Sequence, residues 1–305
     1  MFIRVLGSAA GGGFPQWNCN CANCQAVRAG EPGFLRRTQS SIAVSATGTR
    51  WTLVNASPDI LQQFQAFPGS WPAEGLRGCG VESVVLVDAQ IDHTTGLYML
   101  REKGSPWPIW TTDPVYEDLT RGNPILHLLE HYCGVSRQPI PADGAHFHPQ
   151  GAERLDWQAL PLVSAAPPYS PHRGAPVPGD NVGLAIADPA TGRRVFYAPG
   201  LAEIDDALFA TMAESDCVMV DGTFWTDDEM IAMGLSKKRA RDIGHLAQSG
   251  PGGMIEQLAR LPRHVRRILI HINNTNPILD EASTERAILA AAGIEVAFDG
   301  MEIEL

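Results

Sequence analysis

The sequence predicts an α/β protein (α+β in some schemes) in which two sheets lie between two helical layers, an αββα sandwich of four layers. Paired strand patterns come first, and strand–helix alternation follows in two successive halves of the chain. This order is typical of layered folds that bury a sheet between helices. No stretch resembles a linker, so we expect one domain that spans residues 1–305.

The first half contains short apolar strand patterns separated by capped helical stretches. Strands are expected over 2–6, 40–45, 50–55, 84–87 and 109–110, and helices from 57, over 94–102, 113–119 and 125–132. The turn at 46–49 predicts a hairpin between the second and third strands. Ser57 is expected to be the N-cap of its helix, with Pro58 at the first helical position.

The second half repeats this alternation after a stretch rich in proline and glycine. Strands broken by these residues are expected from 147 to 188, and residues 166–174 form a proline-rich loop that cannot be helical. Further strands are expected over 182–187, 194–198, 217–220, 267–270 and 296–298, and helices over 203–213, 253–261 and 281–292.

Composition and charge exclude several classes of protein. The formal net charge of −11 argues against non-specific nucleic-acid binding, because no basic stripe is present to neutralise phosphates. No apolar run reaches the roughly 18 residues that an integral membrane segment needs. The first residues are too soon interrupted by glycines to form a signal peptide. We therefore expect a cytoplasmic protein.

Three of the six cysteines lie within one short segment. Cys19, Cys21 and Cys24 have the spacing C-x-C-x-x-C, whereas the other three are scattered. In a reducing compartment such a cluster indicates a metal site, and three thiolates match a closed structural zinc site. The fourth ligand must come from elsewhere, and the candidates are His245, His271 and Asn274. The alternative is three buried small apolar residues.

A second group of polar residues follows the predicted strands. Asp92 and His93 come just after the strand at 84–87, and His271 directly follows the strand at 267–270. Two imidazoles and one carboxylate form the triad suited to non-haem Fe(II), and zinc or manganese also accepts such a set. For Asp92 alone, capping of the next helix is the ordinary alternative.

Two further residues can face the same pocket. Asp221 ends the strand at 217–220, and His245 follows a short polar turn. A carboxylate and an imidazole in one pocket can act as an acid–base pair or bind substrate. An equally weighted alternative is that His245 caps a helix and Asp242, three residues earlier, is only a turn residue.

Several motifs resemble known families. Asp88-Ala-Gln-Ile-Asp-His93 and the strand-end His271 resemble the metal-binding motifs of the metallo-β-lactamase superfamily, and the Cys cluster with the ending Phe-Asp-Gly-Met-Glu-Ile resembles the phosphodiesterase branch that includes PhnP. The whole chain is similar to the pyrroloquinoline quinone (PQQ) biosynthesis protein B family. Four segments carry this resemblance: 18–24, 92–97, 166–173 and 272–277.

The resemblance implies a metallo-β-lactamase-like fold with an altered metal content. Asp88 and Gln90 stand where the superfamily has its first two motif histidines, a position near Ser164 lacks the third, and Pro199 replaces the bridging aspartate. One metal site is thereby lost, which disfavours a two-metal hydrolase. The site of Asp92, His93 and His271 remains.

For function, the family implies hydroxylation of the tyrosine ring of a Glu–Tyr-derived precursor of PQQ by a mononuclear Fe(II) oxygenase. The expected partner is this small-molecule or dipeptide precursor. The first alternative is a protein that binds PQQ or its precursor for transport to the periplasm, and the second is a residual zinc hydrolase. We also allow for a homodimer.

Overall fold

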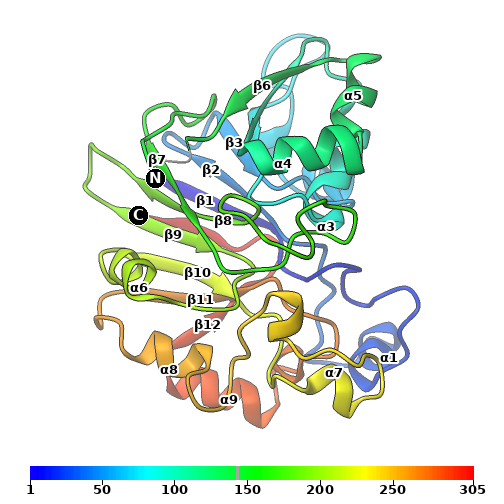
Figure 1. The fold of residues 1–305 in the computed structure, drawn as a ribbon, viewed down its shortest axis with the longest axis vertical. Coiled ribbons are helices and arrows are strands. Elements are labelled where there is room, and N and C mark those ends of the chain that lie inside the picture. Colours follow the sequence, from blue (N-terminus) through cyan, green and yellow to red (C-terminus); the bar gives the residue numbers. More distant parts are fainter. Residues whose placement is uncertain (142–143) are drawn as a thin grey trace.

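Two mixed sheets form the centre of the computed structural model, which describes residues 1–141 and 144–305 (Figure 1). The seven-stranded sheet has the order β13 (Glu302–Glu304), β1 (Phe2–Gly7), β2 (Ser41–Ser45), β3 (Trp51–Val54), β4 (Val81–Val85), β5 (Trp107–Thr111), β6 (Val135–Pro139). The six-stranded sheet has the order β12 (Ile294–Val296), β11 (Arg266–Ile270), β10 (Cys217–Asp221), β9 (Arg194–Ala198), β8 (Val182–Ala187), β7 (Asp156–Pro161).

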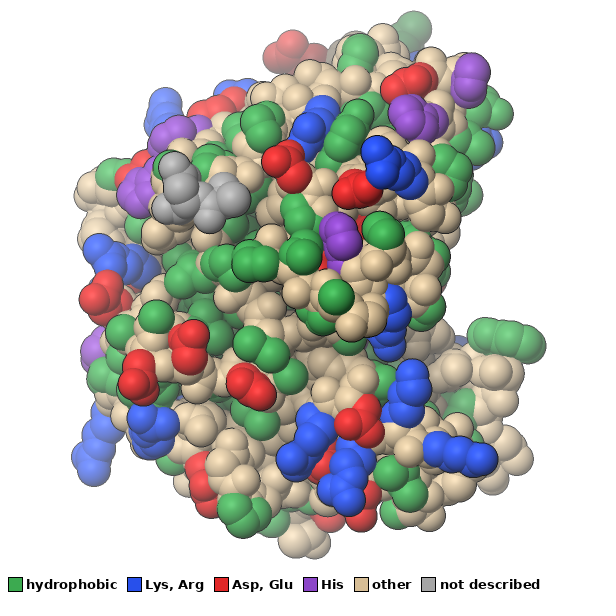
Figure 2. Space-filling model, viewed as in Figure 1, with side chains coloured by type: hydrophobic (Ala, Val, Ile, Leu, Met, Phe, Trp, Pro, Cys, Tyr) green, Lys and Arg blue, Asp and Glu red, His purple; other side chains and the backbone are tan. Residues whose placement is uncertain are grey.

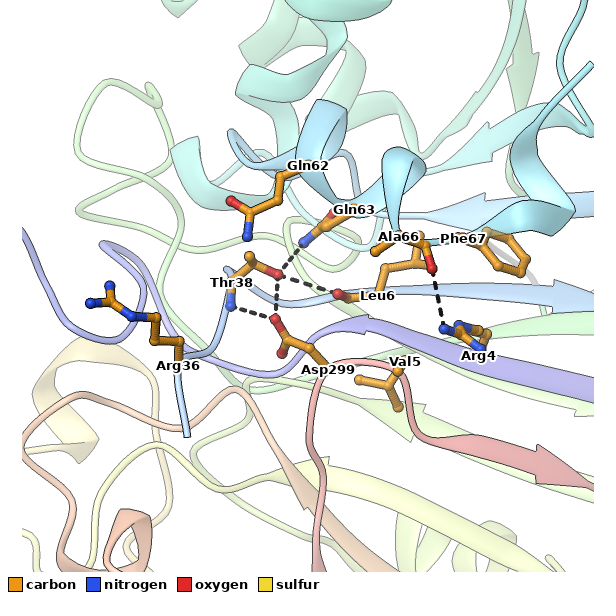
Figure 3. A pocket seen from close by; sticks show the side chains of 11 residues that line it. Arg4, Val5, Leu6, Arg36, Thr38, Gln62, Gln63, Ala66, Phe67 and Asp299 are labelled. Carbon is orange, nitrogen blue, oxygen red and sulfur yellow. Dashed lines mark hydrogen bonds between the residues drawn. The ribbon is translucent and has the colours of Figure 1, made fainter. Parts of the chain in front are cut away.

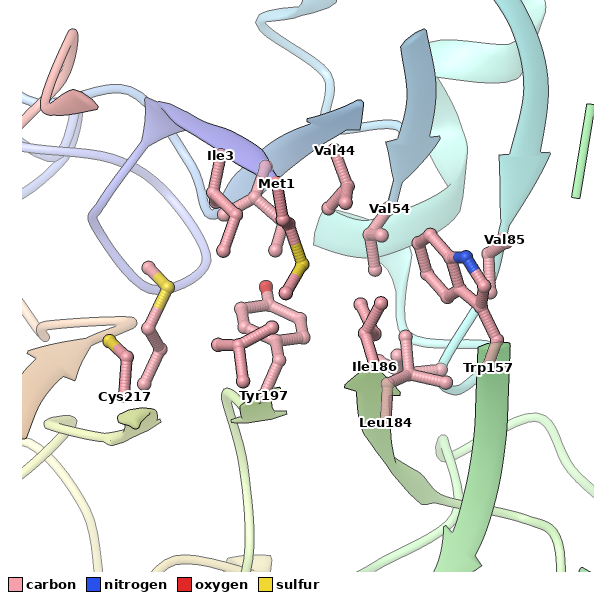
Figure 4. Packing of buried hydrophobic residues seen from close by; sticks show 14 of the residues in the cluster. Met1, Ile3, Val44, Val54, Val85, Trp157, Leu184, Ile186, Tyr197 and Cys217 are labelled. Carbon is pink, nitrogen blue, oxygen red and sulfur yellow. The ribbon is translucent and has the colours of Figure 1, made fainter. Parts of the chain in front are cut away.

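The inner faces of the sheets pack against each other through an apolar core. Figure 4 shows Ile3, Val44 and Val54 of the first sheet facing Ile186 and Tyr197 of the second. All five are buried, as expected where alternate side chains of each strand point to the same face. This core holds the two sheets at a fixed spacing.

Helices cover both outer faces. Their bounds are α1 (Ala22–Ala29), α2 (Ile60–Gln65), α3 (Ile91–Thr94), α4 (Asp113–Glu117), α5 (Ile125–Glu130), α6 (Asp206–Ala213), α7 (Glu229–Ala232), α8 (Met254–Ala259) and α9 (Thr284–Ala291). Apolar residues of α2, α4 and α5 pack on the seven-stranded sheet, and those of α6, α8 and α9 pack on the six-stranded sheet. The predicted αββα sandwich is confirmed.

The hairpin predicted at the turn 46–49 is confirmed, whereas several element boundaries were wrong. β2 pairs antiparallel with β3, and β8 with β9. The strand expected at 84–87 begins at Val81 and ends at Val85, and the helix expected over 94–102 is α3 followed by a 3₁₀ stretch from Thr95 to Leu100. These ends depend on neighbouring strands and helices, which local patterns do not encode.

The predicted helix cap at Ser57 was also wrong. Helix α2 begins at Ile60, and the Ser57 hydroxyl accepts the backbone N–H of Asp59 at 3.2 Å, within a turn that precedes the helix. The Asp59 carboxylate, the nearer candidate for a cap, instead accepts the backbone N–H of Gln39 at 2.8 Å. A tertiary contact therefore takes the side chain that could have capped the helix.

The two ends of the chain are joined near a glycine-rich loop, residues 7–14, at the end of β1. Around a cavity of about 230 Å³, the carboxylate of Asp299 accepts the backbone N–H of Thr38 at 2.6 Å and its hydroxyl at 2.7 Å (Figure 3). The same carboxylate accepts the backbone N–H of Ser8 at 2.9 Å and its hydroxyl at 2.8 Å. These contacts hold the beginning of the loop that follows β1.

Throughout residues 1–141 and 144–305, no helix combines the length and apolar character that crossing a bilayer would require.

The core between the sheets gives a first prediction. Leu184 on β8 is fully buried, so Leu184→Ala should lower the free energy of unfolding by about 2–5 kcal/mol. Leu76→Ala, at a fully exposed leucine, should change it by less than about 0.5 kcal/mol. Urea denaturation of both variants measures the difference, and equal effects would contradict the assignment of the core.

Candidate metal centre

The polar residues predicted at strand ends meet at one edge of the two sheets. Asp92 and His93 lie on α3, which follows β4 of the first sheet. Asp221 ends β10, and His271 follows β11, its parallel neighbour in the second sheet. In the register of β10 and β11, Asp221 is opposite Ile270. Asp221 and His271 therefore lie within one residue of each other along the edge of the sheet. Ligands gather at such carboxyl ends of strands in α/β proteins.

Asp92, His93 and His271 form a triad of close donor atoms. Nε2 of His271 lies 3.1 Å from Oδ2 of Asp92, and Nε2 of His93 lies 3.8 Å from the same oxygen. The potential ligand atoms all lie within 4.8 Å of one another. Nε2 of His93 is buried and has no hydrogen-bond partner among the described residues. A buried, unpaired nitrogen beside a carboxylate and a second imidazole fits a metal ion.

The carboxylate of Asp88 binds His93 and fixes the orientation of its ring, so it is not free to bind a metal. Both carboxylate oxygens of Asp88 lie 2.8 Å from Nδ1 of His93, and one also accepts the backbone N–H of Gln90. An Nδ1–H that donates to Asp88 leaves the Nε2 lone pair for a metal. The Gln90 side chain donates to the backbone oxygen of Ala165 at 2.9 Å. Both residues that the resemblance places at superfamily histidines are thus engaged in other contacts.

Electrostatic interactions within the triad favour a positively charged His93 and a negatively charged Asp92. Burial lowers the pKa of His93, but the carboxylates of Asp88 and Asp92 outweigh burial and raise the pKa to about 9. Burial raises the pKa of Asp92, but His93 and His271 outweigh it and hold that pKa well below its ordinary value. The two carboxylates thus favour positive charge at this point, which a metal cation can supply in place of a proton.

Thr223 joins the remaining polar groups and was missed by the sequence reasoning. Its hydroxyl lies 2.6 Å from Oδ1 of Asp221, 2.9 Å from Nδ1 of His271 and 3.1 Å from Nδ1 of His245. An Nδ1–H of His271 that donates to this hydroxyl leaves Nε2 facing Asp92. The signal available in the sequence was a hydroxyl residue two positions after a strand-end aspartate.

His271 adopts a backbone conformation that is unusual for its residue type. Its φ angle is 62°, in the left-handed region that costs a non-glycine residue roughly 1–2 kcal/mol. The strain is offset by burial and by its hydrogen bonds, which include its backbone oxygen accepting from Thr223 at 2.8 Å. Strained residues of this kind cluster at functional sites.

Asp221 and His245 form a pair beside the triad. Nδ1 of His245 lies 2.7 Å from Oδ2 of the fully buried Asp221, and its ring stacks on that of His271 with centroids 5.5 Å apart. Burial lowers the pKa of His245, but Asp221 outweighs burial and raises it. Asp221, His245 and His271 also lie close enough to hold a metal. Since Asp221 and His245 already bind each other, an acid–base pair fits them better.

The three clustered cysteines lie together with Asn274. Their sulfur atoms are all within 4.8 Å of one another, and Nδ2 of Asn274 lies 3.1 Å from Sγ of Cys19 and 3.5 Å from Sγ of Cys24. Of the three candidates for a fourth ligand, Asn274 is the one at the sulfurs, because His245 and His271 belong to the other centre. Amide nitrogen and oxygen are exchangeable by a half-turn, so Oδ1 can face a metal instead.

The chemistry of this group fits zinc. Burial raises the pKa of the Cys24 thiol to about 12. Around Cys19, hydrogen bonds from neighbouring groups outweigh burial and lower the pKa of the thiol. A zinc ion binds the thiolate form of cysteine and neutralises its charge. Zinc therefore offsets the free-energy cost of burying deprotonated sulfur atoms.

Comparison with known proteins identifies the class. Residues 50–272 match the beta-lactamase superfamily domain, and a diphosphatase of the PhnP family has the same fold, with a TM-score of 0.69 at 17% identity over all of this chain and 97% of the other. The fold and the strand-end site thus define a member of the beta-lactamase superfamily.

The particular family follows from nearer relatives. The chain is 58% identical to coenzyme PQQ synthesis protein B of Azoarcus sp. (strain BH72) and 60% identical to that of Methylobacillus flagellatus, in each case over the full length of both chains. A crystal structure of Zn²⁺-bound PqqB from Methylobacterium extorquens has a TM-score of 0.91 at 38% identity, again over both whole chains. The chain belongs to the coenzyme PQQ synthesis protein B family, and the resemblance seen in its motifs is confirmed.

The role of Asp88 gives a second prediction. Asp88→Asn keeps the size of the side chain but removes the charge that orients His93, so Co(II) affinity at the triad should fall by about 10- to 100-fold. Visible absorption during Co(II) titration measures it. Asp113→Asn, at an exposed aspartate on α4, is the matched control and should leave the affinity unchanged. Equal affinities for Asp88→Asn and wild type would contradict the orienting role.

Proposed function

We propose that this protein acts in PQQ synthesis as an Fe(II)-dependent oxygenase that hydroxylates the tyrosine ring of a Glu–Tyr-derived precursor. The role in PQQ synthesis rests on the name shared by its relatives. The observation that carries the iron proposal is the triad of Asp92, His93 and His271, in which two imidazoles and one carboxylate leave further metal positions open. The cytoplasmic location and a homodimer stay predictions.

The residues around the triad favour one metal over two. Asp88 is bound to His93, Gln90 is bound to Ala165, and Pro199 has no donor atom in its side chain. A hydrolase that clamps hydroxide between two ions needs ligands for both. Fe(II) held by the triad would supply binding and activation of O₂. Zinc and manganese remain alternative occupants, and the Methylobacterium relative is described as Zn²⁺-bound.

The Asp221–His245 pair is placed to move a proton. Replacing an aromatic C–H by C–OH with one atom of O₂ leaves the other atom as water and consumes two electrons from an external reductant and two protons. The ring proton must leave, and His245 can accept it at Nε2 because Asp221 holds its Nδ1. Thr223 keeps both imidazoles in place during this transfer.

A cavity beside His245 is a suitable substrate pocket. It has a volume of about 580 Å³, within the range of small-molecule sites, and has apolar walls that include Leu246 and Pro251. Arg241, with an exposed guanidinium held by Asp227 at 2.8 Å, and the exposed Glu203 lie at its rim. The lining thus has one cation, Arg241, and two carboxylates, Asp227 and Glu203, beside apolar walls, which suits an amino-acid-like compound with both charges.

The charge around this pocket differs from that of the whole chain. Figure 2 shows Lys and Arg side chains gathered beside α7, where Lys237, Lys238, Arg239 and Arg241 are exposed. Arg239 and Arg241 are paired with Asp227, which partly neutralises this region. The exposed Lys237 and Lys238 can still attract a carboxylate-bearing ligand, although the net charge of the chain is −11.

The same pocket supports a second candidate, a protein that binds PQQ or its precursor for transport to the periplasm. This role would need the cavity and the charged groups at its rim but no metal chemistry. A residual zinc hydrolase is supported less well, because the residues at the positions of the second metal are engaged elsewhere.

The oxygenase proposal predicts substrate-dependent O₂ consumption. Protein loaded anaerobically with Fe(II), and given a Glu–Tyr dipeptide and ascorbate as reductant, should consume O₂ and form a hydroxylated ring detectable by mass spectrometry. Asp92→Ala removes the carboxylate of the triad and should lower the rate at least 100-fold. Unchanged uptake in Asp92→Ala would refute the assignment, and tight binding without turnover in any metal form would favour the carrier.

The pocket proposal predicts a binding defect at Arg241. Arg241→Gln removes one charge-assisted hydrogen bond, so the dissociation constant of a Glu–Tyr dipeptide should rise roughly 10-fold or more. Calorimetry measures it. Arg193→Gln, at a surface arginine paired with Asp216, is the matched control. If both variants bind as the wild type does, the substrate lies elsewhere.

A further inference from the structure

We infer that the cysteine site positions Asp92 and His271, so that zinc held by Cys19, Cys21 and Cys24 sets the geometry and affinity of the second metal centre. The inference rests on the proposed function of the triad as a metal site. It assigns to the cysteine site a role beyond local stability, and two separate chain segments carry the argument.

The first segment is 271–276, which contributes a side chain to each site. His271 belongs to the triad, and Asn274, three positions later, lies against the cysteine sulfurs. Residues 271–276 are all buried. Asn276 donates through Nδ2 to the backbone oxygens of Gly222 at 3.0 Å and Thr223 at 3.2 Å. A buried segment tied at this many points shifts as a unit, because a local bend would leave polar groups unpaired.

The cysteine side of this segment is also tied down. Nδ2 of Asn23, which lies between Cys21 and Cys24, donates to the backbone oxygens of Asn274 at 3.2 Å and Asn276 at 3.0 Å. The cysteine loop therefore holds both the side chain of Asn274 and the backbone around it. Displacement of this loop displaces the segment that begins with His271.

The second segment is the glycine-rich loop that leads from β1 to the cysteines. Its residues Ser8 and Ala10 pair with Ile272, through Ile272 N–H to Ser8 O and Ala10 N–H to Ile272 O, each at 2.9 Å. Gly11 then lies directly against Asp92: a methyl group at position 11 would be 3.3 Å from both Cγ and Oδ2 of that carboxylate. The loop thus limits the position of Asp92 from one side.

Together the two segments place two of the three metal ligands under the control of the cysteine site. His271 is held from the C-terminal side through Asn274, and Asp92 is confined by the loop that continues to Cys19. His93 is held separately, because its Nδ1 is paired with Asp88, which lies between β4 and α3. Loss of zinc should therefore loosen two ligands and leave the third in place.

The test compares two cysteine substitutions in the full-length protein. Elemental analysis first establishes zinc at the cysteine site, and Co(II) is then titrated into the triad by visible absorption. Cys24→Ser should lose the zinc and weaken Co(II) binding at the triad by at least 10-fold, with an altered absorption spectrum. Cys79→Ser, which removes a thiol that packs on the outer face of the seven-stranded sheet and belongs to neither site, should keep both the zinc and the affinity.

Two further variants keep the test decisive. If Cys24→Ser does not fold, Asn274→Ala provides the same comparison with all three thiols present, and its Co(II) affinity should also fall. Gly11→Ala should retain zinc yet change the Co(II) spectrum, because the added methyl displaces Asp92. Loss of zinc with unchanged Co(II) affinity would overturn the inference alone. Absence of Co(II) binding at the triad of the wild type would overturn the proposed function as well.

Discussion

The candidate centre depends on the contact between His271 and Asp92, which joins the carboxyl edges of two separate sheets. Neither sheet supplies the whole site: α3, after β4 of the first sheet, carries Asp92 and His93, and His271 follows β11 of the second sheet. The 3.1 Å separation of the two side chains is a consequence of how closely the sheets pack. Close-packed interiors transmit small changes in volume, so the apolar core between the sheets sets the geometry of the polar edge.

Burial of charge explains why each polar group of the centre has a dedicated partner. Asp88, His93, Asp221 and His271 are all buried, and an unpaired buried charge costs several kcal/mol, roughly 3–5 when a partner is removed. Asp88 is paired with His93 and Asp221 with His245, while the Thr223 hydroxyl serves both Asp221 and His271. The unpaired Nε2 of His93 is the exception, and it faces the triad.

The positions of the ligands could be predicted from the sequence, whereas their partners could not. Asp92, His93 and His271 were recognisable because each follows an apolar strand, and the cysteines because of their spacing. The roles of Thr223 and Asp88 depend on which nitrogen of a distant histidine they contact, and no local pattern encodes a tautomer. Asn274 was one of three candidates for the fourth zinc ligand. Asn274 and His271 are close in sequence, and only the folded structure shows that they lie at different sites. The predicted start of α2 was wrong for a similar reason, because the side chain of Asp59 makes a tertiary contact with Gln39 that the local sequence does not encode.

The replacement at Asp88 also bears on how a two-metal scaffold can become a single-metal one. A histidine at this position would be neutral and would offer a lone pair to a first metal. The carboxylate instead accepts from His93 and so strengthens the remaining site, because an anionic partner makes the imidazole a better ligand. Under the proposed single-metal assignment, an aspartate at position 88 would thus remove a ligand of one ion and improve a ligand of the other. Under this assignment both effects depend on one contact: the buried carboxylate needs the His93 N–H as much as His93 needs the carboxylate, and histidine at position 88 would lose that contact.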